Sequence, residues 1–438
     1  MIISIIIPTR ERADYLKESI QTALQIPDRN IEIIISDNAS TDGTKQVISE
    51  ISDPRVKYIN TGKHVSMREN FEFGLHNSSG DYVIFFGDDD GILPRQFKFL
   101  RRILEKERPD ALGWNVPSIF VWPGEERDRK SGSVTFDKRK LFGKIHKCDS
   151  DACRKHLLAC KLNQLRFIPG VYAAGCVSRD YWGRIAAPDG TYFNSSVPDA
   201  YFEFRALLEG GNFLHVDHAF VLGGQSPTSG AKLFQTLPDA NDPRSRPLHR
   251  GIAELKLDKL TDVIEHTLSL TLLSFSTLET VRARFPKENQ IPDYLAWYRY
   301  VLSENSSWHS KVRGTLRGYA IKSGTLSEFE QAESGQADNP ALKTYRKVLS
   351  GSGTVFSEVK EIIRNHVTRL PILPGPKKFR LSGKIAEKNT ILTAVNIYDS
   401  TLADDYEHIL DGTGFREDIW KQAVKRSRVY PLRKKGNT

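Results

Sequence analysis

The chain of 438 residues lacks the features that mark a secreted or membrane-spanning protein. It contains no run of about 18 consecutive apolar residues, so the sequence predicts no helix that crosses a bilayer. Its first residues, MIISIIIPTR, have neither the basic segment nor the cleavage site of a secretory signal peptide. We therefore expect a cytoplasmic protein.

Cysteine is also scarce, with four in the whole chain. Cys148, Cys153 and Cys160 lie close together in the sequence and Cys176 stands apart, but none has the short paired spacing of a zinc site. In a reducing compartment such cysteines usually serve as small buried hydrophobic residues. We interpret all four in this way.

Two glycine-rich nucleotide-binding motifs are missing. No dinucleotide fingerprint follows the first predicted strand, residues 2–7, and no Walker-type phosphate loop occurs in the sequence. These absences argue against a dinucleotide-dependent dehydrogenase and against a P-loop enzyme. The net charge of +9 favours anionic partners such as sugar nucleotides, nucleic acid or an acidic membrane surface, but does not choose among them.

The most informative stretch runs from Tyr82 to Asp90. Residues 82–86 are apolar, aromatic or β-branched, which is typical of a strand buried on both faces, and Asp88, Asp89 and Asp90 follow directly. Open α/β sheets bind ligands just beyond the carboxyl ends of their strands. Carboxylates suit Mg²⁺ or Mn²⁺, which in turn bind a diphosphate. The alternative is a solvated acidic turn.

Strands and helices alternate through the first hundred residues. The predicted strands are 2–7, 31–35, 55–59 and 82–86, and the predicted helices between them are 14–24, 45–51 and 66–76. Short connections of this kind give a parallel, right-handed, doubly wound sheet. The α/β fold class follows from this alternation.

The length of the chain predicts more than one domain. We expect an α/β domain over residues 1–245, a smaller α-helical domain over 251–370, and a linker with a basic tail over 371–438. The helical domain is a candidate for oligomer formation. The tail mixes Lys and Arg with apolar residues, so it either lies on an anionic membrane surface or is a solvated end.

Four motifs in order carry a family resemblance. Pro8-Thr9-Arg10, residues 36–44 (SDNASTDGT), residues 79–82 (SGDY) and residues 87–90 (GDDD) resemble the family 2 glycosyltransferases of the GT-A fold. Over residues 1–245 the chain is most similar to bacterial sugar transferases of the abequosyltransferase type. The resemblance implies a GT-A-type doubly wound mixed sheet, mostly parallel, and a nucleotide-sugar donor. It also implies an inverting, metal-dependent transfer to a glycan or lipid-linked acceptor in surface polysaccharide biosynthesis.

The resemblance also implies roles for single residues. Those expected at the nucleotide are Thr9 and Glu11 in the nucleoside pocket, Asp37 at the base, Arg68 at the base or diphosphate, and Asp88 at the ribose. Asp89, together with Asp90, would bind Mn²⁺ or Mg²⁺. The sequence departs from relatives at Gly87, where many carry the first carboxylate of Asp-x-Asp, and at Glu11, where Asn is common.

Asp199 is the expected general base. It follows Pro198 near the start of a predicted helix, and a carboxylate there can remove a proton from an acceptor hydroxyl. A simple helix-capping role is the alternative. Likewise, Asp37 could be only a turn former and Arg68 only a solvated helix residue.

Other features leave further alternatives open. Trp122 either stacks on a sugar or packs in the core, and the glycine- and hydroxyl-rich segment 223–230 either contacts a ligand or is a flexible loop. A nucleotidyltransferase would also use a carboxylate-bound metal, but it usually has a glycine- and arginine-rich loop after the first strand. A nucleic-acid-binding protein would cluster basic and aromatic residues, which this sequence does not. We therefore expect no nucleic-acid partner.

Overall fold

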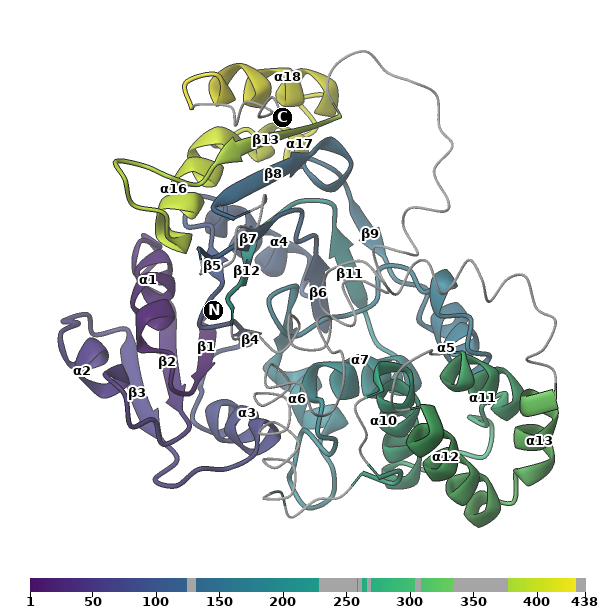
Figure 1. Ribbon diagram of the computed structural model, residues 1–438. Helices are drawn as coiled ribbons and strands as arrows, with labels where there is room; N and C mark the ends of the chain where they lie inside the picture. The colour runs from purple at the N-terminus through teal and green to yellow at the C-terminus, as the bar shows by residue number, and fades with distance from the viewer. Residues whose placement is uncertain are drawn as a thin grey trace, which may run out of the picture.

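The computed structural model describes residues 1–123, 131–227, 258, 262–265, 269–303, 309–334 and 377–430. Its centre is an eight-stranded sheet in the order β3-β2-β1-β4-β10-β6-β11-β9 (Figure 1). The strands are β1 (Ile3–Thr9), β2 (Ile31–Asp37), β3 (Val56–Asn60), β4 (Tyr82–Phe85), β6 (Ala111–Trp114), β9 (Ile145–Lys147), β10 (Gly175–Ser178) and β11 (Phe213–Val216).

The sheet is mixed, as predicted. β3, β2, β1 and β4 are parallel to one another, and β11 is parallel to β6. β10 runs antiparallel between β4 and β6, and β9 is antiparallel to β11. The first four predicted strands occur within two residues of their expected limits. β1, β2 and β4 consist mostly of buried apolar residues, whereas β3 is only partly buried.

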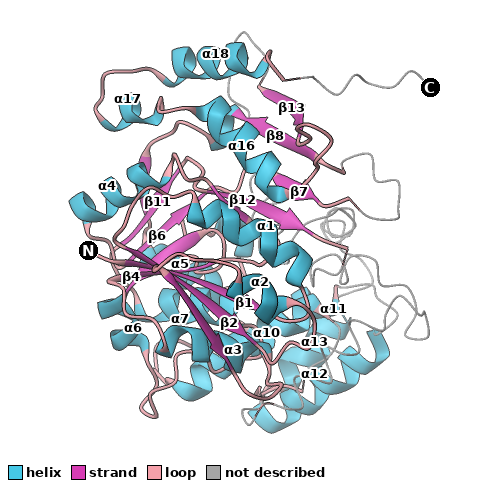
Figure 2. Cartoon of the chain, turned by 90° about the vertical axis from the view of Figure 1, so that its left-hand side faces the viewer, coloured by secondary structure: helices cyan, strands magenta, loops and turns pink. Residues whose placement is uncertain are grey.

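Helices cover both faces of this sheet, as Figure 2 shows. Alternate β1 residues point to opposite sides: Ile5 packs in the cluster that includes α1 (Ala13–Leu24) and α4 (Phe97–Glu107), and Ile6 packs in the cluster that includes α3 (Met67–His76). The remaining helices of this region are α2 (Thr44–Ser49), α5 (Ser150–Leu158), α6 (Arg179–Ile185) and α7 (Pro198–Glu209). This arrangement confirms the doubly wound α/β fold.

Two small sheets lie beyond the large one. β12 (Val221–Gln225) is antiparallel to β5 (Gly91–Ile92) and parallel to β7 (Ile119–Val121), so it brings residues after position 220 beside the acidic segment. β8 (Ser133–Asp137) pairs with β13 (Lys378–Ser382). Segments far apart in the sequence therefore meet at this end of the molecule.

The described part of the predicted helical domain contains α10 (Leu270–Arg284), α11 (Tyr294–Leu302), α12 (His309–Ser323) and α13 (Leu326–Ser334). α10 packs on α7, and its Phe275 and Leu278 belong to the same buried cluster as residues of α3 and α7. The helices thus share a hydrophobic core with one face of the sheet. Residues 335–370 of the expected helical domain lie outside the described residues.

Residues 378–430, expected as linker and tail, are folded. Besides β13 they form α16 (Ile391–Leu402), α17 (Tyr406–Leu410) and α18 (Arg416–Ser427), and α16 packs against α1 and β5. Ile419 and Trp420 of α18 belong to the buried cluster that includes α1 and α4. The expected linker and basic tail over 371–438 do not describe residues 378–430, because their apolar side chains bury themselves on the α/β domain.

Two further findings complete the description. No helix in the described ranges is both long and apolar enough to cross a bilayer. All four cysteines are reduced; Cys148, Cys153 and Cys176 are buried and Cys160 is half-buried, which agrees with their interpretation as small core residues.

Candidate functional site

Three strands end beside one another at the predicted site. Thr9, the last residue of β1, pairs with Asp37, the last residue of β2, and β4 on the other side of β1 ends at Phe85, just before Gly87–Asp90. Because the strands are parallel, their carboxyl ends lie at one edge of the sheet. Thr9, Asp37 and residues 87–90 therefore lie at one edge of the sheet.

Asp88 lies against the end of β1. One of its carboxylate oxygens accepts a hydrogen bond from Thr9 Oγ1 at 2.8 Å, and the other accepts one from Arg12 Nε at 2.7 Å. Asp88, Asp89 and Asp90 are all buried, with at most 7% of each residue exposed. The alternative of a solvated acidic turn is therefore wrong.

Asp89 is bound from two further segments. Its Oδ2 lies 2.7 Å from Arg12 Nη2 and accepts a hydrogen bond from the Ser226 amide at 3.1 Å. Its backbone carbonyl accepts a hydrogen bond from Trp122 Nε1 at 2.9 Å. Trp122 is buried and packs edge-on against Tyr15, so it is a core residue that fixes the acidic segment rather than an exposed sugar platform.

Asp90 accepts hydrogen bonds only from backbone amides among the contacts that the structure gives it. Gly87 N donates to Oδ2 at 3.0 Å and Gly224 N donates to Oδ1 at 2.7 Å. An ideal Cβ on Gly87 would lie 2.5 Å from the Tyr172 hydroxyl and 2.6 Å from Asp90 Oδ2. A side chain at position 87 would therefore crowd Tyr172 and Asp90.

The acidic segment has too little positive charge around it to remain fully ionised at low cost. Burial raises the pKa of Asp88 to about 6 and that of Asp90 to about 7, and the charge of Asp89 adds to both shifts. Arg12 opposes the shift at Asp88. Burial and the three carboxylates also raise the pKa of Tyr172, which therefore lies near them as a neutral phenol.

Asp37 is completely buried and held by three donors. The Tyr58 hydroxyl donates at 2.6 Å, Asn60 Nδ2 at 2.9 Å and the Ser40 amide at 3.0 Å. The amide contact is that of a turn former, but the two side-chain donors from β3 show that Asp37 does more than shape the turn. Its contact with a base stays a prediction.

Glu11 has a left-handed backbone, with a φ of 53°. Asn adopts this conformation more readily than most residues, which gives a physical reason for its frequent use at this position in relatives. Glu11 instead anchors the neighbouring loop: its Oε1 accepts hydrogen bonds from Thr41 N at 2.7 Å and from Thr41 Oγ1 at 3.0 Å. Its contact with a nucleoside stays a prediction.

Arg68 is not a solvated helix residue. Its side chain is 6% exposed and makes a two-point ion pair with Asp258, with N···O distances of 2.6 and 2.7 Å. A third hydrogen bond of 3.1 Å runs to the carbonyl oxygen of Phe193. In this structure Arg68 joins α3 to the loop before α7, and its approach to a diphosphate stays a prediction.

Asp199 is half-buried in the first turn of α7. The residue that caps this helix is Val197, and no side chain makes a capping hydrogen bond there, so Asp199 is not the N-cap. Its charge suits the positive end of the helix dipole. The role of Asp199 as general base stays a prediction.

Four residues hold the acidic segment in place: Arg12, Trp122, Gly224 and Ser226. The sequence singled out Trp122 and segment 223–230 but did not indicate that they contact the acidic segment, where the amides of Gly224 and Ser226 donate to Asp90 and Asp89. Arg12 gave no signal, because its partners lie 76 residues away in the sequence.

The carboxylate oxygens at this edge are of the ligand type that binds divalent cations. Carboxylate oxygens are ligands that Mg²⁺ and Mn²⁺ prefer, and a cation would offset the buried negative charge. Both described contacts of the Asp89 carboxylate use Oδ2. No group of three or more His, Cys, Asp or Glu among the described residues is arranged around a common metal position.

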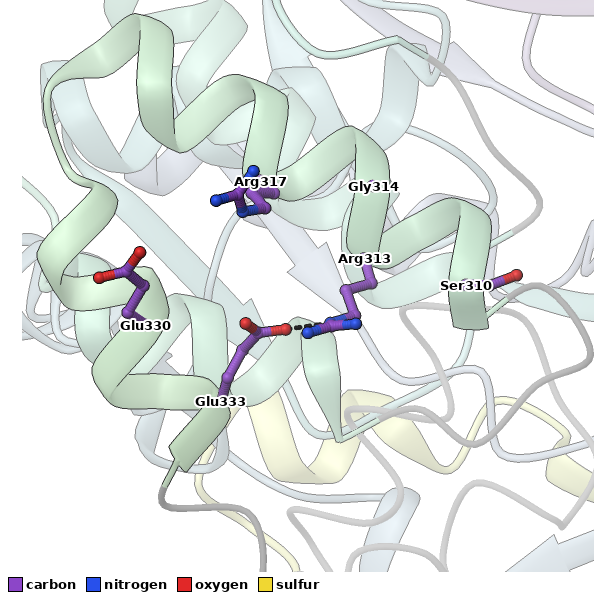
Figure 3. A pocket seen from close by; sticks show the side chains of 6 residues that line it. All are labelled: Ser310, Arg313, Gly314, Arg317, Glu330 and Glu333. Carbon is purple, nitrogen blue, oxygen red and sulfur yellow. Dashed lines mark hydrogen bonds and ion pairs between the residues drawn. The ribbon is translucent and has the colours of Figure 1, made fainter.

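A cleft lies between α12 and α13, away from the acidic segment in the sequence (Figure 3). Its lining residues are Ser310, Arg313, Gly314, Arg317, Glu330 and Glu333. Arg313 and Glu333 form an ion pair across it. The two basic and two acidic side chains balance in charge, so this cleft has no preference for an anionic ligand.

Comparisons with known proteins show what the N-terminal part of the chain is similar to. Residues 4–154 match the sequence model of the family described as "Glycosyl transferase family 2". A GalNAc(5)-diNAcBac-PP-undecaprenol beta-1,3-glucosyltransferase of Campylobacter jejuni is 35% identical over 153 residues, which cover 33% of this chain and 50% of that protein. Abequosyltransferase RfbV of Salmonella typhimurium is 34% identical over 113 residues, or 24% of this chain and 34% of that protein.

These alignments thus span half or less of the length of the two relatives. Among solved structures, S. aureus TarS 1-349 in complex with UDP-GlcNAc aligns with 79% of this chain and 93% of its own, at 13% identity and a TM-score of 0.41. The matched segment contains all four motifs that carry the family resemblance. Residues 4–154 of this chain therefore form a segment that resembles glycosyl transferase family 2.

Proposed function

We propose that this chain is an inverting, metal-dependent glycosyltransferase that moves a hexose-type sugar from a nucleoside diphosphate to a glycan or lipid-linked acceptor. The observation that carries the proposal is the buried cluster of Asp88, Asp89 and Asp90 at the shared edge of β1, β2 and β4, within a segment that resembles family 2. A rigid group of carboxylates at strand ends suits an activated sugar phosphate far better than it suits nucleic acid.

Each residue near the edge has a distinct task in this proposal. Asp37 accepts a hydrogen bond from the base, Thr9 and Glu11 border the nucleoside, and Asp88 binds the ribose. Arg68 would leave Asp258 to approach the base or the diphosphate. Because Thr9 and Asp88 are already hydrogen-bonded to each other, the pocket for the nucleoside is partly organised before the donor binds.

Asp89, with Asp90, would hold Mn²⁺ or Mg²⁺. When bound, the ion would neutralise the negative charge that develops on the diphosphate as the sugar leaves. Asp199 would take the proton of the acceptor hydroxyl as that oxygen attacks the anomeric carbon from the face opposite the diphosphate. One base and one displacement give inversion at that carbon.

The lipid-linked acceptor is suggested by the printed name of the Campylobacter jejuni relative, which includes an undecaprenol-linked substrate. We therefore place this chain at the cytoplasmic face of a membrane, bound through α18. Ile419 and Trp420 of this helix are buried against the domain. The exposed basic and apolar residues of α18 and of the positions that flank it are Phe415, Lys421, Lys425, Arg428 and Val429.

The membrane contact has a direct test. Vesicles that contain anionic phosphatidylglycerol should pellet the protein, and vesicles of phosphatidylcholine should not. The double variant Lys425→Glu/Arg428→Glu should lose this binding, whereas Lys311→Glu/Arg317→Glu on exposed positions of α12 should keep it. Equal binding of both double variants would refute the assignment to α18.

The glycosyltransferase proposal is tested by a screen of nucleotide sugars for thermal stabilisation of the protein with and without Mn²⁺. One base and one sugar class should raise the melting temperature only when the metal is present. Asp89→Ala should abolish that metal-dependent rise. If Asp89→Ala is stabilised as well as the parent protein by the best donor and Mn²⁺, the metal assignment is wrong.

A further inference from the structure

Arg12 occupies the centre of the acidic cluster. It is the residue before α1, and its Nε lies 2.7 Å from Asp88 Oδ1 while its Nη2 lies 2.7 Å from Asp89 Oδ2. The same Nη2 donates to Ser226 Oγ at 2.7 Å. One guanidinium therefore bridges the carboxylate assigned to the ribose and the carboxylate assigned to the metal.

The surroundings of Arg12 hold it in this position. Its guanidinium lies 5.0 Å from the centre of the Tyr15 ring, a distance suited to a cation–π contact. Tyr15 packs edge-on against Trp122, and Trp122 donates to the backbone carbonyl of Asp89. Tyr15 and Trp122 therefore link the Arg12 side chain to the backbone of Asp89, in addition to the direct ion pair between the two residues.

A divalent ion and this guanidinium make conflicting demands on Asp89. Oδ2 already receives two donors, one from Arg12 and one from the Ser226 amide. An ion bound to the same carboxylate would lie within a few ångströms of the guanidinium, where two positive charges repel strongly in a buried site. The ion can bind well only if Arg12 moves away from Asp89.

We propose that Arg12 is the built-in counter-cation of the acidic cluster and competes with the divalent metal for Asp89. This inference rests on the proposed function, because it takes Asp89 to be a metal ligand. In the metal-free protein Arg12 keeps the buried carboxylates together. On metal binding its guanidinium leaves Asp89 and becomes available to an anionic group, such as a phosphate of the donor.

The test is a titration with Mn²⁺ alone, in which electron paramagnetic resonance measures the free ion. Arg12→Gln should bind Mn²⁺ about tenfold more tightly than the parent protein, because a competing charge has been removed. Arg101→Gln is the matched control. Arg101 has the same 16% side-chain exposure as Arg12. It pairs with Asp28, shortly before β2, and donates to the Met1 carbonyl, shortly before β1, so the control loses an equal charge at the other end of the strands.

The outcomes are distinct. A folded Arg12→Gln protein that binds Mn²⁺ no more tightly than Arg101→Gln overturns the inference, because a residue that only supports the fold would give unchanged or weaker binding. If Arg12→Gln does not fold, Arg12→Lys decides. A lysine ammonium lacks the planar fork through which Arg12 reaches Asp88 and Asp89 with separate nitrogens. Arg12→Lys should therefore also bind Mn²⁺ more tightly than the parent protein, and equal or weaker binding overturns the inference.

A separate variant distinguishes this failure from failure of the proposed function. Asp89→Ala should lose Mn²⁺ binding. If it binds the ion as well as the parent protein does, the metal assignment is wrong and the competition for Asp89 is overturned with it. If Asp89→Ala loses the ion but Arg12→Gln gains nothing, only the role of Arg12 is refuted.

Discussion

Gly224 offers a sharp test of how the acidic segment is held. An ideal Cβ at this position would lie 1.7 Å from the carbonyl oxygen of Asp89 and 2.4 Å from its carbonyl carbon. Both are backbone atoms, so no side-chain rotation can relieve the clash. Gly224→Ala must therefore push β12 away from residues 89–90 and weaken the hydrogen bond from Gly224 N to Asp90.

The cost can be worked from two contributions. Overpacking of this kind costs about 1–3 kcal/mol. Loss of a hydrogen bond to a charged acceptor adds about 1.5–3 kcal/mol. We therefore expect Gly224→Ala to lower the free energy of unfolding by about 3–6 kcal/mol, which in a chain of this size corresponds to a fall of roughly 6–12 °C in melting temperature.

The neighbouring glycine is the control. A Cβ on Gly223 would meet Ile119 Cδ1 at 2.7 Å, and this atom is the end of a flexible side chain. Gly223→Ala should therefore cost about 1 kcal/mol. Urea and thermal unfolding of both variants measure the difference. If Gly224→Ala is as stable as Gly223→Ala, the close approach of β12 to the acidic segment is wrong.

Three further predictions follow from the site. Asp199→Asn should lower the turnover number for sugar transfer about 10²–10⁴-fold and leave donor binding unchanged, and a matching loss of donor affinity would contradict its role as base. Burial raises the folded-state pKa values of Asp88 and Asp90 to about 6 and 7, so the metal-free folded protein binds more protons than the unfolded chain between about pH 4 and 7. Its free energy of unfolding should therefore fall as pH rises through that range. Asp90→Asn should flatten this pH dependence in urea unfolding, and an unchanged slope would refute the shift at Asp90. Arg68→Ala and Asp258→Ala should each lower the free energy of unfolding by about 3–5 kcal/mol, because each leaves a buried charge without its partner; additive losses in the double variant would show that the two residues do not act as a pair.

The central strands could be predicted from the sequence because each depends on local pattern alone. Residues 82–86 are a continuous apolar run and residues 31–35 are apolar except for Glu32, a pattern typical of a strand in the interior of a sheet. The common edge of β1, β2 and β4 followed from their parallel order. The placement of Asp88–Asp90 was therefore predictable to the level of the segment.

The supports of the site were not predictable in the same way. Arg12 donates hydrogen bonds to Asp88, 76 residues away in the sequence, and to Ser226, 214 residues away. Such contacts depend on the tertiary fold and leave no local pattern in the sequence. The C-terminal segment was misjudged for a related reason. β13 pairs with β8 far earlier in the chain, and the buried residues of α18 stand among so many Lys and Arg residues that the segment resembles a solvated tail.

The most direct test of the central claim compares two aspartates at opposite ends of β4. With the donor found in the screen and Mn²⁺ present, the initial rate of donor hydrolysis should fall at least about 100-fold in Asp89→Asn. It should stay within about twofold of the parent rate in Asp81→Asn, whose carboxylate is 61% exposed beside the N-terminus. Equal rates in the two variants would contradict the claim that the acidic cluster binds the activated sugar through a metal.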